Sequence, residues 1–239
     1  MITKYSPNFS KKRRKNKDIK AIVIHYTGMQ SEIVAIKRLS NFKSKVSCHY
    51  LINRKGQILK MVDENKIAWH AGKSKWKNLN NLNNCSIGIE LVNKGHDFGY
   101  EKFTDIQINQ LIKLCKNLKK KYRIKNSNIV GHSDIAPCRK KDPGEKFPWK
   151  HLSRYKVGIW YNLTKNDLKL RNIEATNNEK KLFFLYLKKI GYCLKKKHSE
   201  NSNYVIKAFQ RRYRPKIING KIDKECLKIA KNLIKLGLN

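Results

Sequence analysis

The chain has 239 residues, which is enough for one domain with a sizeable core and a smaller second unit. It carries 55 Lys and Arg against 17 Asp and Glu, a formal net charge of +38, which raises nucleic acid, an anionic membrane or another polyanion as partners. The charge is spread along the whole chain without a recognised nucleic-acid-binding motif, so we expect no specific nucleic-acid partner.

Residues 1–17 form a basic N-terminal arm that contains Lys11-Lys12-Arg13-Arg14-Lys15. This arm lacks the apolar run of a secretory signal peptide or a transmembrane segment, and its composition is typical of a disordered tail. We therefore expect a cytoplasmic protein; periplasmic or cell-wall association would need another route. The six cysteines are scattered without a Cys-x-x-Cys pair, which indicates reduced thiols.

An apolar run at residues 21–24 predicts a central strand that ends at His25. Residues 32–42 follow as a predicted helix with an apolar stripe of Ile33, Ile36 and Leu39. Residues 46–53 and 57–62 are β-rich and flank Gly56, which suits the positive φ of a tight turn.

Three side chains in this part are candidates for substrate contact. Period-two alternation places His49 on the same face as Leu51, so a hydrogen-bonded core role is as plausible as a substrate contact. Trp69 and His70 precede the small residues Ala71 and Gly72, a setting suited to an aromatic wall and a polar tip in a binding groove.

Residues 85–92 predict a strand with Ile87, Ile89 and Leu91 on one face. Glu90 then lies on the other face beside Gly88, which leaves room for a metal or water. A Glu that simply faces solvent is the alternative.

Thr104 and Gln107 have the spacing of a capping box, and the apolar residues from Ile108 to Leu118 follow at helical spacing. A short strand at 128–130 comes next, and Pro148 suits the first turn of a further helix. These elements predict an α/β domain with a mixed central β-sheet flanked by helices.

The loop after residue 130 places His132 and Asp142 among Pro137, Pro143 and Gly144, and such a loop can present metal ligands. A third ligand must come from elsewhere, and His25 at the end of its strand is the best candidate. Two histidines and one carboxylate would leave the fourth position of zinc open for water. Cys138 lies in the same loop, and we favour a neighbouring role for it.

Five ordered motifs within residues 18–160 resemble one family, the zinc-dependent N-acetylmuramoyl-L-alanine amidases, which includes phage lysozyme-amidases and animal peptidoglycan recognition proteins. The motifs are Ile24-His25-Tyr26-Thr27, Ser47-Cys48-His49-Tyr50-Leu51-Ile52, Ala68-Trp69-His70-Ala71-Gly72, Ser86-Ile87-Gly88-Ile89-Glu90-Leu91, and Gly131-His132-Ser133-Asp134 through Lys140-Lys141-Asp142-Pro143-Gly144.

This resemblance implies roles for individual residues. His25, His132 and Asp142 take the positions of the zinc ligands, and Glu90 that of the general base. Lys140 takes the position of the cation beside the reacting carbonyl. The bond cleaved would join the lactyl group of N-acetylmuramic acid to L-alanine in peptidoglycan or muropeptides.

Residues 161–178 read as a linker rich in Asn, Lys and Thr, and residues 179–239 predict a small bundle of three helices. Within the bundle, Ile190-Gly191-Tyr192, Ala208-Phe209-Gln210-Arg211-Arg212-Tyr213 and Asn219-Gly220-Lys221-Ile222-Asp223 resemble a peptidoglycan-binding domain. We expect this unit to add binding rather than chemistry, and a chain that ends near Thr176 to fold alone.

Two other classes stay open at this point. A non-catalytic peptidoglycan sensor would share the resemblance but typically lacks a complete ligand set. A basic nucleic-acid-binding protein with structural zinc would require a closed site of four ligands. We expect a monomer with a peptidoglycan or muropeptide partner and no transmembrane segment.

Overall fold

The computed structural model of the chain describes residues 2–3, 5–194 and 201–237. A mixed six-stranded sheet has the order β1-β5-β4-β9-β3-β10. Strands β3, β4, β9 and β10 are parallel, and β5 is antiparallel to β4. The strands are β1 (Ile2–Thr3), β3 (Ala21–Tyr26), β4 (Tyr50–Ile52), β5 (Ile58–Lys60), β9 (Ser86–Leu91) and β10 (Ile129–Gly131).

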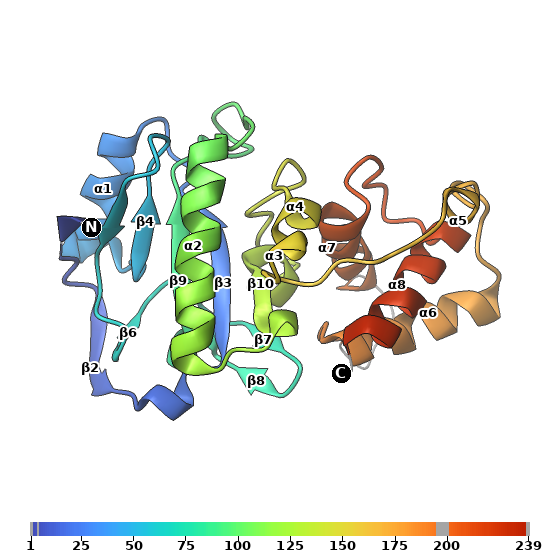
Figure 1. The fold of residues 1–239 in the computed structure, drawn as a ribbon, viewed down its shortest axis with the longest axis horizontal. Helices are drawn as coiled ribbons and strands as arrows, with labels where there is room; N and C mark the ends of the chain where they lie inside the picture. Colours follow the sequence, from blue (N-terminus) through green and yellow to red (C-terminus); the bar gives the residue numbers. More distant parts are fainter. Residues whose placement is uncertain (1, 4, 195–200, 238–239) are drawn as a thin grey trace.

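One face of this sheet is covered by helix α2 (Asp105–Tyr122), which crosses it in Figure 1. Ile22 and Ile24 of β3 and the alternate residues of β9 form one buried cluster with the apolar stripe of α2. The mixed α/β architecture expected from the periodicity is confirmed.

The start of α2 differs in one detail from the predicted capping box. Thr104 caps the helix, because its hydroxyl accepts a hydrogen bond from Gln107 N–H. The Gln107 side chain does not accept a hydrogen bond from the Thr104 backbone N–H, as a full capping box would require. It is fully buried and donates to the carbonyl oxygens of Ile52 (2.9 Å) and Val92 (3.2 Å), so it joins α2 to strand β4 and the end of β9.

Helix α1 (Glu32–Ser40) and the 3-10 turn η2 (Phe42–Ser44) lie near β4. The buried residues of α1 are Ala35 and Leu39, whereas Ile33 is 66% exposed. The expected stripe was therefore wrong at Ile33, because the buried face of α1 is rotated toward Ala35. Gly56 has φ of 78°, as the predicted turn requires.

The N-terminal arm is ordered where the structure describes it, contrary to the expectation of a disordered tail. Strand β2 (Phe9–Arg13) pairs antiparallel with β6 (Lys66–Ala68), and η1 (Asn16–Asp18) follows. Arg14 is buried and donates hydrogen bonds to three backbone carbonyl oxygens. The pairing of β2 with β6 and the hydrogen bonds of the buried Arg14 hold the N-terminal arm in place, although its composition alone suggested disorder.

Short elements complete the N-terminal part. They are β7 (Lys75–Trp76), β8 (Leu79–Asn80), η3 (Leu82–Asn84), η4 (Asn126–Asn128), α3 (His132–Ile135) and α4 (Trp149–Arg154). Pro148 is the N-cap of α4, one position before the predicted first turn.

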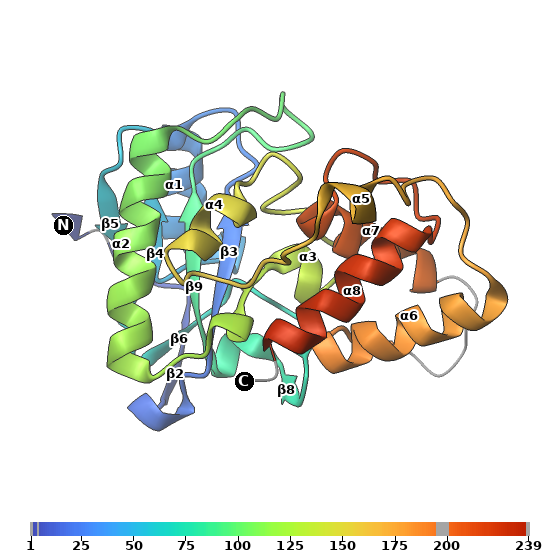
Figure 2. The same cartoon turned by 45° about the vertical axis from the view of Figure 1, so that its right-hand side comes forward.

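The described residues of the C-terminal part form helices that pack together (Figure 2). They are α5 (Lys165–Leu168), α6 (Asn177–Ile190), α7 (Asn201–Tyr213) and α8 (Lys224–Gly237). Thr176 and Glu179 form the capping box of α6, and Gly191 ends it with φ of 137°. Within the described ranges, no helix combines the length and apolar character that crossing a membrane requires.

The bundle and the sheet share one hydrophobic core. Ala21, Val23 and Val130 on the face opposite α2 belong to the same buried cluster as Phe183 and Phe209 of the bundle. Figure 1 shows α7 beside α3 at the β10 edge of the sheet. The proposed boundaries at 160, 178 and 179 stay a prediction, but the two parts pack as one body through this core.

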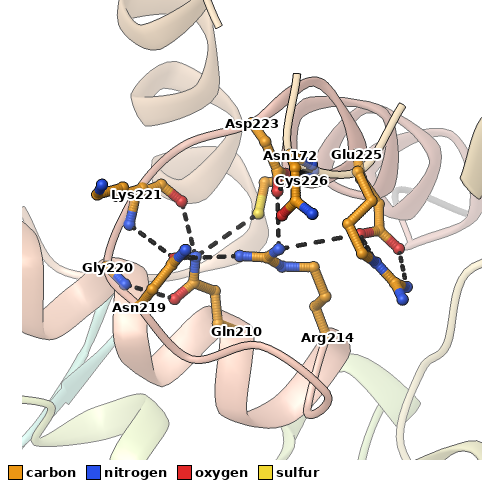
Figure 3. A network of polar contacts seen from close by, with 10 residues as sticks. Asn172, Gln210, Arg214, Asn219, Gly220, Lys221, Asp223, Glu225 and Cys226 are labelled. Atoms are coloured by element: carbon orange, nitrogen blue, oxygen red, sulfur yellow. Dashed lines mark hydrogen bonds and ion pairs between the residues drawn. The ribbon is translucent and has the colours of Figure 1, made fainter. Parts of the chain in front are cut away.

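Inside the bundle, a buried polar network surrounds Arg214 (Figure 3). Its guanidinium lies 2.7 Å from Asp223 Oδ2 and 3.9 Å from Glu225 Oε2. Arg171 binds Glu225 through two nitrogens, at 2.6 and 2.5 Å. Two carboxylates and two guanidinium groups thus balance each other, which makes the burial of these charges tolerable.

Candidate metal centre and active site

His25, His132 and Asp142 meet at the C-terminal ends of parallel strands. His25 lies near the end of β3, and His132 directly follows β10, which pairs with β3. Carboxyl ends of adjacent parallel strands meet at one edge, so both imidazoles reach the same point. The ligand loop, residues 132–142, closes because Ser133 N–H donates to the carbonyl oxygen of Asp142 (2.9 Å).

A glycine permits this closure. A Cβ atom on Gly131 would lie 2.6 Å from Cδ of Pro143, the residue after Asp142. Any larger residue would push the two ends of the ligand loop apart.

The three ligand atoms lie within hydrogen-bonding distance of one another. His25 Nδ1 is 3.0 Å from His132 Nδ1 and 2.9 Å from Asp142 Oδ2, and His132 Nδ1 is 3.1 Å from the same oxygen. All three residues are buried. This cluster of three possible ligands has the donor types that zinc takes in sites with an open fourth position.

The surroundings set the protonation that metal binding needs. His132 Nε2 lies 3.1 Å from the carbonyl oxygen of Ala71, so it carries the proton and leaves Nδ1 free as a ligand. Burial lowers the pKa of His25 to about 4, which keeps it neutral. Burial alone would raise the pKa of Asp142, but the adjacent His132 and His25 hold it well below its usual range. The donor set therefore fits a divalent cation.

Glu90 is brought to this cluster by strand register. It pairs with His25 across β9 and β3, and its side chain shares the face opposite α2. One carboxyl oxygen, Oε2, is buried without a hydrogen-bond partner among the described residues. Burial raises the pKa of Glu90 well above its usual range, and the charge of Asp142 adds to the rise. Such a carboxyl group is suited to accept and return a proton.

Lys140 is exposed and lines the cavity two residues before Asp142. After burial, its charge contributes to the lowered pKa of His25, and it offsets part of the rise that burial causes in the pKa of Glu90. Cys138 is also exposed and lies outside the ligand cluster, in keeping with the neighbouring role expected for it.

Trp69 and His70 both line the cavity and are half-buried. His70 Nδ1 lies 3.1 Å from His25 Nε2, so His70 also supports a ligand. Its ring fills the space above Gly88, where a Cβ atom would lie 2.4 Å from the ring. The room beside Glu90 that the sequence suggested for metal or water is thus occupied by His70.

The structure does not bring His49 to the cavity, which corrects its assignment as a substrate contact. His49 is fully buried, and its Nδ1 accepts a hydrogen bond from Gly88 N–H (2.9 Å). Burial, followed by the charge of Arg14, lowers its pKa to about 3. His49 is therefore a neutral core histidine that supports strand β9, the other role considered for it.

The cavity over the cluster measures about 470 Å³. Its walls include residues that the sequence did not single out, namely Tyr26, Arg38, His96 and Arg139. Tyr26 hydroxyl lies 2.7 Å from His96 Nδ1. The available signals were the position of Tyr26 directly after His25 and that of Arg139 within the ligand loop, whereas Arg38 and His96 carry no local pattern.

A buried cluster of three possible metal ligands, beside a carboxyl group with one oxygen that has no hydrogen-bond partner among the described residues, is typical of metal-dependent hydrolases. The chain belongs to the N-acetylmuramoyl-L-alanine amidase family, whose profile matches residues 15–145.

Two relatives illustrate this similarity. The N-acetylmuramoyl-L-alanine amidase AmiD of Escherichia coli is 36% identical over 231 residues, which cover 90% of this chain and 82% of AmiD. The 1,6-anhydro-N-acetylmuramyl-L-alanine amidase AmpD of Haemophilus influenzae is 36% identical over 170 residues, 63% of this chain and 90% of AmpD.

Solved structures agree over nearly the full length. E. coli AmiD, in complex with the substrate anhydro-N-acetylmuramic acid-L-Ala-D-gamma-Glu-L-Lys, matches with a TM-score of 0.82 at 34% identity and covers 97% of this chain and 99% of AmiD. AMPDH3 from Pseudomonas aeruginosa matches with a TM-score of 0.83 at 30% identity and full coverage of both chains.

Proposed function

We propose that this chain is a zinc-dependent amidase that hydrolyses the amide bond between N-acetylmuramic acid and L-alanine in muropeptides. The observation that carries the proposal is the meeting of His25 Nδ1, His132 Nδ1 and Asp142 Oδ2 within about 3 Å of each other beside Glu90. This arrangement opens on a cavity large enough for a small ligand.

The same three residues would hold zinc. A zinc ion with an open position polarises an amide carbonyl and lowers the pKa of a bound water. Glu90 would take a proton from the attacking water and deliver it to the leaving amine. Lys140 would lie beside the carbonyl oxygen and stabilise the negative charge that develops there. Trp69 forms part of the cavity wall and would contact the substrate.

The charge of the cavity rim suits an acidic stem peptide. The substrate named with AmiD contains a γ-linked Glu, which keeps a free α-carboxylate. Arg38 and Lys141 line the cavity of this chain and supply positive charge for such a group. One chain contributes every residue of the site, so we propose that it acts as a monomer.

The test is a comparison of zinc content and muropeptide cleavage in the parent and in His132→Ala. The parent should hold about one equivalent of zinc and release the peptide from an anhydro-muropeptide, and the variant should lose both properties. His151→Ala is the matched control, because His151 lies on α4 outside the ligand cluster. Full cleavage by a chelator-treated parent would overturn the zinc mechanism. Zinc binding without cleavage would favour a non-catalytic sensor.

A further inference from the structure

The last turn of α7 places Arg212 inside the N-terminal part. Arg212 is 2% exposed, and its guanidinium donates to Asp134 Oδ2 at 2.5 Å and to the carbonyl oxygen of Ile129 at 3.0 Å. Its carbon Cζ lies 4.1 Å from the centre of the Trp149 ring. A buried guanidinium from the bundle is thus held by groups of the N-terminal part on three sides.

Asp134 links this arginine to a metal ligand. Its Oδ2 also accepts a hydrogen bond from Gly131 N–H (2.8 Å), which caps helix α3 at the turn where His132 is the first residue. Its Oδ1 accepts a hydrogen bond from the hydroxyl of Tyr192 (2.7 Å), a second residue of the bundle. One carboxylate therefore joins the start of the ligand loop to two side chains of the bundle.

The neighbouring arginine reaches the other end of the ligand loop. Arg211 Nε lies 3.8 Å from Glu145 Oε2, and Glu145 follows Asp142 by three residues. Glu145 Oε2 is also 3.1 Å from His96 Nε2, and His96 Nδ1 contacts the Tyr26 hydroxyl in the cavity wall. Two consecutive arginines of α7 thus contact one carboxylate near the start of the ligand loop and one just after its end.

We infer that the C-terminal bundle positions the metal ligands, with Arg212 acting through Asp134 on His132. The inference rests on the proposed metal site. Arg212, Asp134 and Tyr192 are positioning residues, since none of them is a ligand or lines the cavity.

The same residues bear on the expected peptidoglycan-binding role. In the motif around Arg211 and Arg212, Phe209 and Tyr213 are fully buried in the core, and Gln210 belongs to the network of Figure 3. These side chains face inward, so the motif that suggested wall binding serves packing and contact with the ligand loop in this chain. Wall binding by another surface of the bundle stays a prediction.

The test measures the zinc dissociation constant of the full chain by competition with a chromogenic chelator. Arg212→Met and Asp134→Asn should each raise this constant by about tenfold, the range found for residues that support metal ligands. The double variant should bind zinc about as weakly as the weaker of the two single variants, because each change breaks the same Arg212–Asp134 ion pair.

Arg214→Met is the matched control. Arg214 is an equally buried arginine that directly follows α7, but its partners lie within the bundle. This variant should lower the melting temperature and leave the zinc dissociation constant unchanged. An Arg212→Met variant that only melts earlier, with parental zinc affinity, would overturn the inference.

If Arg212→Met does not fold, a pair of variants that each remove a single hydroxyl group tests the inference instead. Tyr192→Phe removes only the hydroxyl that binds Asp134, whereas Tyr213→Phe removes a buried hydroxyl without a hydrogen-bond partner among the described residues. Weaker zinc binding in Tyr192→Phe than in Tyr213→Phe supports the inference, and equal affinities overturn it. A parent that binds no zinc would instead refute the proposed metal site.

Discussion

Glu90 takes its chemical character from its place in the sheet. On a surface strand its carboxyl group would be ionised and solvated. Here the pairing of β9 with β3 places it beside His25, and burial raises its pKa. The side chain is therefore equipped to carry a proton between water and a leaving amine.

The variant Glu90→Gln tests this role, because it keeps the shape of the side chain and removes proton transfer. Turnover of an anhydro-muropeptide should fall by about 10² to 10⁴, while zinc content stays at the parental level. Glu174→Gln, a change at an exposed glutamate of the C-terminal part, should keep parental turnover. Near-parental turnover in Glu90→Gln would place the base elsewhere, with His70 as the next candidate.

His49 makes stability depend on pH. Its pKa is about 3 in the folded chain, where burial and Arg14 disfavour the charged form, against about 6.5 when unfolded. Above pH 6.5 both states are neutral at this residue. As the pH falls below 6.5 the unfolded state binds the proton first, so the free energy of unfolding decreases until the pH reaches about 3.

Urea unfolding at pH 7 and pH 5 measures this effect against His49→Gln, which cannot titrate. Between these two pH values the parent should lose about 2 kcal/mol more than the variant, since one pKa unit corresponds to about 1.4 kcal/mol. The remaining titrating groups are common to both proteins and cancel in the comparison. Equal losses would mean that His49 titrates normally in the folded chain.

Among the elements, β2 shows how one buried side chain anchors a basic segment. Arg14 follows β2 and donates to the carbonyl oxygens of Glu64 (2.9 Å), Asn83 (3.1 Å) and Ser86 (2.7 Å). Ser86 begins β9, so this arginine joins the N-terminal arm to the strand that carries Glu90.

Arg14→Ala should lower the free energy of unfolding by about 3 kcal/mol, because buried hydrogen bonds to a charged group are lost and three carbonyl groups lose a donor. Arg13→Ala is the matched control, since Arg13 is the exposed neighbour and should change stability little. Chemical unfolding of both variants measures the difference. Equal stabilities would show that the arm contributes no anchoring.

On the scale of the whole molecule, the bundle and the sheet depend on each other. Trp76, Val130 and Ile135 of the N-terminal part are buried in one cluster with Phe183 and other residues of the bundle. The Trp76 ring packs edge-on against Tyr192, with ring centres 5.1 Å apart.

A chain that ends at Thr176 is therefore expected to behave differently from the autonomous domain that the sequence suggested. Removal of the bundle exposes an apolar surface and leaves Asp134 without Arg212 and Tyr192. The truncated chain should be less soluble and unfold at lower urea concentration than the parent. Parental solubility and stability would restore the prediction of an independent catalytic domain.

Much of the site was predictable from sequence, because local patterns place ligands at strand ends. Alternation in residues 85–92 put Glu90 on the face opposite the aliphatic residues, and the apolar run before His25 indicated a central strand. The loop from His132 to Asp142 contains Pro137 and is flanked by Gly131, Pro143 and Gly144, as in a rigid turn. These features depend on neighbours in sequence, so periodicity is enough to reveal them.

Other features depend on which distant segments pack together, and only the tertiary structure decided them. The register of β9 against β3 set Glu90 beside His25, and packing against Arg14 and Gly88 buried His49 away from the cavity. Arg212 meets Asp134 across 78 residues of sequence. A charged residue usually faces solvent, so the local sequence around Arg212 gives no sign that this side chain is buried. Burial of a charged side chain depends on whether the packed elements bring a partner of opposite charge next to it.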